Sequence, residues 1–220
     1  MQPDTHRLIE QLAAEAVPVQ PLPPPWRRTL AWLGVSVALA LLMVVLLGWR
    51  GAPPHDLAQP GGGWSWWGSV ATGALAALAV FQVSIPGRSP AWAWLPLPAV
   101  AAWFVGMGWG CLAETGADGG HLALGLGSWH CALAITLVST PMLLVMLVLV
   151  RHAGALRPVR TATLAMLSAA GLSSAAVSLV HGHESPALTL VWHGGVVLVL
   201  CVAAWLSGRP LLDWIGYARR

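Results

Sequence analysis

The sequence is poor in charge and contains no lysine, since all eleven of its basic residues are arginine. Only 9% of the 220 residues are charged, whereas 57% are hydrophobic, and this composition does not suit a water-soluble domain. The chain also lacks a phosphate-binding loop, a convincing serine-histidine-aspartate order and a pair of nearby carboxylates. These absences argue against a hydrolase or a nucleotide-dependent enzyme.

Six apolar runs of about twenty residues follow one another, and each is long enough to cross the ~30 Å hydrocarbon core of a bilayer. The runs cover residues 29–49, 64–86, 90–112, 129–150, 161–180 and 187–207. Lipid offers no hydrogen-bond partners to an exposed backbone, so the runs must be helices. The sequence therefore predicts an all-α polytopic membrane protein, with a six-helix bundle over residues 29–207 and short tails at 1–28 and 208–220.

No Asp, Glu, Lys or Arg lies inside any of the six runs. Ion and proton pathways usually need such groups near the middle of the membrane, so a small transporter is a poor fit. The arginines gather between the runs instead. Ten of the eleven fall on one side of the predicted membrane, and only Arg50 falls on the other. The excess of positive charge on one side predicts that both termini are cytoplasmic, and it indicates no nucleic-acid partner.

The amino-terminal tail has a helical part, residues 4–17, and a proline-rich part, residues 18–25, which would act as a stiff spacer. The helical part is amphipathic. The predicted docking face for a partner consists of Leu8, Ile9, Leu12 and Val17. A helix of this length gains stability mainly by packing against something. The alternatives are a disordered tail or a helix lying on the bilayer surface.

Histidines and cysteines gather at the outer ends of the runs. The set comprises Cys111, His121, His130, Cys131, His181, His183 and His193. Imidazoles and thiolates are ligands of Zn(II) and of similar metals, so this face is a candidate metal or oxidant sensor. The alternatives are a polar surface, buried apolar thiols, or a disulfide between Cys111 and Cys131. If His130 and His193 faced each other, they would favour a haem- or quinone-binding redox protein instead.

Four segments carry a resemblance to a known family. They read DTHRLIEQLAAEAVPVQPLPPPWRRTL, WHCALAITLVSTPMLL, HGHESPALTLVWHG and GRPLLDW. The whole chain resembles the NrsF-like family of six-span bacterial inner-membrane proteins, which negatively regulate an extracytoplasmic-function sigma factor. The resemblance implies a non-enzymatic anti-sigma factor that needs no cofactor and whose partners are a sigma factor and the bilayer.

The same resemblance implies that metals or oxidants acting on a pair of outer cysteines release the sigma factor. Cys131 matches the first cysteine of that pair. At the place of the second, this sequence reads Val180-His181-Gly182-His183 and has no cysteine. Two interpretations remain open: either Cys131 binds metal together with His181 and His183, or this chain has kept sequestration and lost sensing.

Overall fold

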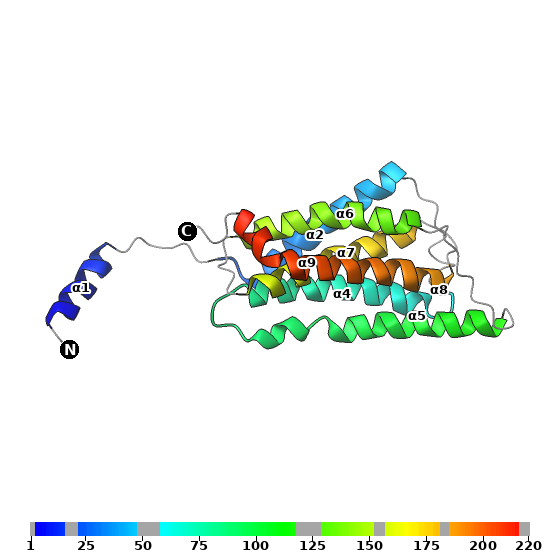
Figure 1. Ribbon diagram of the computed structural model, residues 1–220, viewed down its shortest axis with the longest axis horizontal. Coiled ribbons are helices and arrows are strands. Elements are labelled where there is room, and N and C mark those ends of the chain that lie inside the picture. The colour runs from blue at the N-terminus through cyan, green and yellow to red at the C-terminus, as the bar shows by residue number, and fades with distance from the viewer. Residues whose placement is uncertain are drawn as a thin grey trace.

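A computed structural model describes residues 3–15, 22–47, 58–117, 129–151, 157–180 and 185–215, and all regular structure within these ranges is helical. The short tail helix is α1 (Pro3–Ala14). The membrane-spanning helices are α2 (Pro25–Leu47), α4 (Gly62–Val83), α5 (Leu97–Ala117), α6 (Trp129–Val150), α7 (Pro158–Val180) and α9 (Gly195–Trp214). Figure 1 shows these six side by side, with α1 apart from them. Among the described residues, six helices are long and apolar enough to cross a membrane, which confirms the predicted fold class.

Two spans begin with a short irregular element. A 3₁₀ turn, η1 (Pro90–Trp94), precedes α5. The last span begins with α8 (Pro186–Thr189) and a π-helical turn, η3 (Leu190–Gly194), which leads directly into α9. Proline lacks a backbone N–H and therefore suits the start of a helix, where that N–H would be unbonded in any case.

Helices α2 and α9 extend beyond the apolar runs that predict them, α2 at its start and α9 at its end. Helix α2 begins at Pro25 and so includes Arg27 and Arg28, and α9 continues to Trp214 through Arg209. The backbone keeps its helical hydrogen bonds beyond the hydrocarbon core, because water does not break a helix that tertiary packing supports. The membrane boundary and the helix end are therefore different positions.

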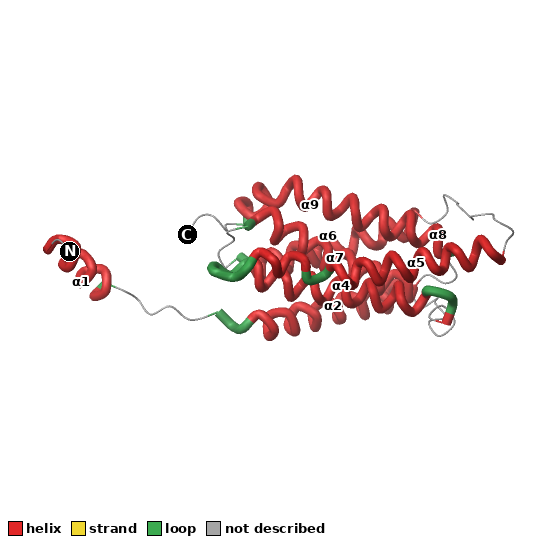
Figure 2. The backbone as a smooth tube through the Cα atoms, turned by 90° about the horizontal axis from the view of Figure 1, so that it is seen from below, coloured by secondary structure: helices red, strands yellow, loops and turns green. Residues whose placement is uncertain are grey.

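Helices α4 and α7 form the centre of the bundle, and Figure 2 shows them between α9 and α2. In the most apolar 18-residue stretch of α7, 72% of the residues are buried inside the protein, whereas the corresponding figure for α2 is 22%. Small residues permit this close packing, because a Cβ atom at Gly171 would meet the backbone N of Gly73 at 3.2 Å. The small-residue spacing in these two spans therefore serves helix packing.

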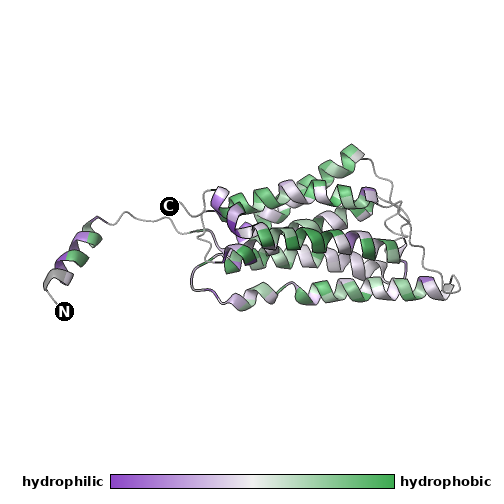
Figure 3. Cartoon of the chain, viewed as in Figure 1, coloured by the Kyte–Doolittle hydropathy of each residue, from purple (hydrophilic) through white to green (hydrophobic). Residues whose placement is uncertain are grey.

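The outward faces of the peripheral helices are apolar, as the hydropathy colouring in Figure 3 shows. On α2, Val45 and Leu46 are 77% and 74% exposed, although both are strongly hydrophobic. An apolar surface of this extent suits contact with lipid tails and not with water. The carboxyl-terminal end of α2 also stands clear of its neighbours in Figure 1.

Candidate functional site

The tail helix α1 presents apolar side chains that are exposed to solvent. Leu8, Ile9 and Leu12 are 54%, 49% and 61% exposed, and all lie on one face at helical spacing. The helix ends at Ala14, earlier than the predicted end, and the fourth predicted docking residue, Val17, lies outside the described residues. Within the described chain, α1 thus offers an apolar face that no other helix covers.

The opposite side of α1 is polar. Every described side chain from Thr5 to Glu15 is exposed, and the residues that lie away from the apolar face are His6, Arg7, Glu10 and Gln11. A helix with one apolar and one polar face is typical of segments that bind in a groove of a partner protein. The structure therefore places three of the four predicted docking residues, Leu8, Ile9 and Leu12, on an accessible surface.

Helix α2, which follows the tail, is anchored at its first turn. The Nη2 atom of Arg28 donates a hydrogen bond to the carbonyl oxygen of Leu149, in the last turn of α6, at 2.8 Å. The same guanidinium lies over the Phe81 ring of α4, with its carbon 4.6 Å from the ring centroid. Arg28 therefore joins the start of α2 to the ends of two neighbouring spans.

A chain of hydrogen bonds joins α2 to the central helix pair. The indole nitrogen of Trp32 donates to the Ser168 hydroxyl at 3.0 Å, and that hydroxyl donates to the carbonyl oxygen of Gly73 at 2.8 Å. On α4, the Ser69 hydroxyl donates to the carbonyl oxygen of Gly171 at 2.8 Å. Trp32 and Ser168 are both fully buried. We call Trp32, Ser168 and Gly73 the polar seam.

Cys131 begins α6, but it does not face the surface. Its side chain is fully buried in an apolar cluster with Met43 of α2, Ile135 of α6 and Val177 of α7. Cys111, near the end of α5, is half-buried. Neither cysteine is in a disulfide, and the same is true of Cys201. Among the alternatives that the sequence left open for Cys131, these surroundings fit a thiol buried among apolar side chains.

The two histidines of the described outer region have different surroundings. His130 is exposed, and its ring centroid lies 4.0 Å from that of Trp129. His193 is buried in the π turn, with its Nδ1 atom 2.8 Å from the Ser174 hydroxyl of α7. One ring is thus at the surface and the other is packed against α7, so they do not form the facing pair that a haem site would need.

The predicted metal site falls largely on residues that the structure does not describe. His121, His181 and His183 all lie outside the described ranges. Among the described residues, no three histidine, cysteine, aspartate or glutamate side chains gather closely enough to hold a metal ion. Cys111, His130, Cys131 and His193 therefore do not form such a site on their own, and the contribution of the loop histidines stays a prediction.

Sequence reasoning missed the polar seam and Arg28. Trp32 lies in the middle of its apolar run, away from the membrane boundaries where tryptophan usually anchors a helix. A buried tryptophan usually finds a hydrogen-bond partner for its N–H. The position of Trp32 in the middle of a span could therefore have indicated a hydrogen bond to another helix. Arg28 carried no comparable signal, because an arginine before a span serves topology equally well.

A family model described as NrsF, negative regulator of sigma F, matches residues 12–214. The match covers all six long helices and ends where α9 ends. It begins inside α1, so Leu12 lies within the matched region while Leu8 and Ile9 precede it. Comparisons with curated proteins and with solved structures found no match.

Proposed function

The chain belongs to the NrsF family of negative regulators of sigma F, and we propose that it holds its sigma factor against the bacterial inner membrane through helix α1. The family confirms that the chain is a non-enzymatic regulator with a sigma factor as partner. The same match excludes the alternative prediction of a haem- or quinone-binding redox protein.

The exposed apolar face of α1 is the observation that carries the proposal. In a membrane protein whose other large apolar surfaces suit lipid, Leu8, Ile9 and Leu12 lie on a helix outside the six spans. Their spacing fits the pattern by which an amphipathic helix inserts anchor residues into a groove of its partner. A sigma factor bound in this way is held at the membrane and kept from RNA polymerase by location and by occlusion.

The test introduces charge into the docking face. Leu8→Asp together with Leu12→Asp should abolish co-purification of the sigma factor, because docking would bury two unpaired carboxylates. The matched control is His6→Asp with Gln11→Asp, which adds the same charge to exposed polar positions of α1 outside the docking face. Both variants should insert into the membrane normally. Unchanged co-purification with the first variant would remove α1 from the interface.

The orientation of the spans is part of the proposal, because α1 must be on the cytoplasmic side to meet a sigma factor. It is supported by the ten arginines on one side of the membrane and the single Arg50 on the other. Reporter fusions after Gly154 should be cytoplasmic, and fusions after Gly119 should be periplasmic. The reverse result would place α1 outside the cell and would end the proposal.

We further propose that metal or oxidant on the outer side releases the sigma factor, with Cys131, His181 and His183 as the sensing residues. The thiol of Cys131 is fully buried between α2, α6 and α7. A metal ion reaches it only if these helices separate at the outer end, so metal would favour that separated state. Such a difference in affinity between two states is what a signal needs in order to shift their populations.

The test is a titration with Zn(II) or Cd(II). A variant with His181→Ala and His183→Ala should lose metal affinity and metal-induced release, and should still hold the sigma factor without metal. His6→Ala, on the tail helix, is the control and should leave both properties unchanged. Equal metal binding by the parent and the double variant would leave sequestration as the only supported function.

A further inference from the structure

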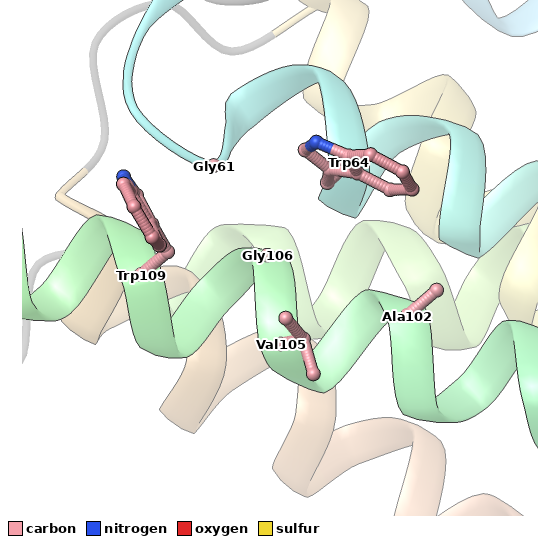
Figure 4. A pocket seen from close by; sticks show the side chains of 6 residues that line it. All are labelled: Gly61, Trp64, Ala102, Val105, Gly106 and Trp109. Carbon is pink, nitrogen blue, oxygen red and sulfur yellow. The ribbon is translucent and has the colours of Figure 1, made fainter.

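A shallow apolar groove runs along the outward side of α4 and α5, near the end of the bundle where α4 begins. Its volume is about 420 Å³. The lining residues are Gly61, Trp64, Ala102, Val105, Gly106 and Trp109. Figure 4 shows the two tryptophans on either side of Gly61, with Val105 and Ala102 beside them on α5. Trp64 and Trp109 are 72% and 65% exposed, so the groove opens outward from the bundle.

The groove exists because the backbones of α4 and α5 are in contact beneath it. Gly61 has a φ of +79°, and a Cβ atom there would overlap the carbonyl oxygen of Gly106. A Cβ atom at Gly106 would in turn meet the backbone N of Ser65 at 2.7 Å. The glycines thus form a low floor, while the large side chains of Trp64 and Trp109 rise at its edges. This arrangement is a trough with two indole walls.

We propose that this trough binds one acyl chain of a phospholipid, whose ester or phosphate oxygens accept hydrogen bonds from the indole N–H groups. The trough is on a surface that faces lipid, and its walls are almost entirely hydrocarbon. Within the described part of the chain, the indole nitrogens of Trp64 and Trp109 donate no hydrogen bond to another residue. Indoles at the end of a span lie at the level of the lipid headgroups, where such acceptors are abundant.

A second copy of the chain does not suit the trough. A helix with its side chains is about 10–12 Å across, and the two indole ridges would keep it from the glycine floor. The small residues that usually permit close helix packing are Gly61 and Gly106, and here the contact between α4 and α5 already uses them. A single alkyl chain is thin enough to lie between the indoles and to reach the floor.

The test compares phospholipid retention by variants of the full chain purified in mild detergent, using native mass spectrometry. The parent should retain phospholipid, and Ala102→Phe, which fills the trough, should lose most of it. Ala101→Phe is the matched control, because Ala101 is exposed and adjacent but does not line the trough. Trp109→Phe keeps an aromatic wall without the donor and should weaken retention about five-fold, as expected for the loss of one hydrogen bond.

Two results would overturn the proposal. One is equal retention by the parent and by Ala102→Phe, since ordinary boundary lipid would not distinguish them. The other is a parent protein that is dimeric and that becomes monomeric with Ala102→Phe, because the trough would then be the binding site of a second copy of the chain. Melting temperatures of the variants provide the check on folding, and a variant that melts like the parent but loses the lipid supports the assignment.

Discussion

Replacing Ser168 with alanine should destabilise the bundle by more than the loss of one oxygen atom suggests. The Ser168 hydroxyl accepts the indole N–H of Trp32 and donates to the carbonyl of Gly73. The Gly73 carbonyl lies inside α4, where the helix ladder also uses it. The indole N–H has no such second use, and it is fully buried. Leaving a buried donor unbonded costs about 1–3 kcal/mol.

The size of the effect in a membrane protein is expected to lie at the lower end of that range. Interhelical hydrogen bonds in membranes couple by about 0.6 kcal/mol on average and by up to about 1.7 kcal/mol. We therefore expect Ser168→Ala to cost about 1–2 kcal/mol. Trp32→Phe removes the donor and some packing, and Ser168 still donates to Gly73 in that variant. Its cost should come mainly from the lost ring volume.

The two variants should not be additive. In the double variant no donor is left unbonded, so its destabilisation should fall about 1 kcal/mol short of the sum of the two single variants. The measurement is unfolding of the purified chain by SDS in mixed micelles, with all four proteins compared in one detergent. Additivity within about 0.3–0.5 kcal/mol would show that the bond between Trp32 and Ser168 contributes nothing to stability, and the reasoning on the polar seam would be wrong.

Two further predictions concern packing and accessibility. Gly171→Leu should prevent stable folding, because backbone atoms of α4 lie 3.2 Å from a Cβ atom at that position. Gly34→Leu should be tolerated, since no neighbouring atom lies within 4 Å of a Cβ atom there. Thermal unfolding of the two variants distinguishes them. A membrane-impermeant maleimide added to the outside of cells should label Cys111, which is half-buried, much faster than Cys131, which is fully buried. Faster labelling of Cys131 would contradict its place in the core.

The spans and their number were predictable, because each span depends only on the length of an apolar run, which can be read directly from the sequence. A run of twenty apolar residues has only one stable form in lipid, so α2 and α6 follow from length and composition. The amphipathic tail was predictable for a related reason. The spacing of Leu8, Ile9 and Leu12 differs from that of their polar neighbours, so periodicity identifies the exposed apolar face of α1.

The burial of individual residues inside the spans was not predictable from the sequence. A span that is apolar on every side carries little periodicity, so its pattern does not show which face meets protein and which meets lipid. Trp32 and Cys131 lie fully inside the bundle, while Val45 and Leu46 face outward, although all four occur in strongly apolar runs. The prediction that Cys131 belongs to an outer sensing set depended on its position near a helix end, which says nothing about its depth.

The weak packing of α2 has a consequence for how the tail responds to the bilayer itself. The apolar part of α2 begins after Arg28 and runs to Leu47, so it is about 29 Å long and nearly matches a typical hydrocarbon core of about 30 Å. Few neighbours hold its far end, so in thinner lipid the helix accommodates the mismatch by tilting, and the lipid thickness then sets the angle at which the helix leaves the membrane. Thinner or thicker lipid therefore changes the height and direction of the segment that carries α1. Sigma-factor affinities measured in detergent or in short-chain lipid should differ from those in native-thickness membranes, even when every contact in the core is unchanged.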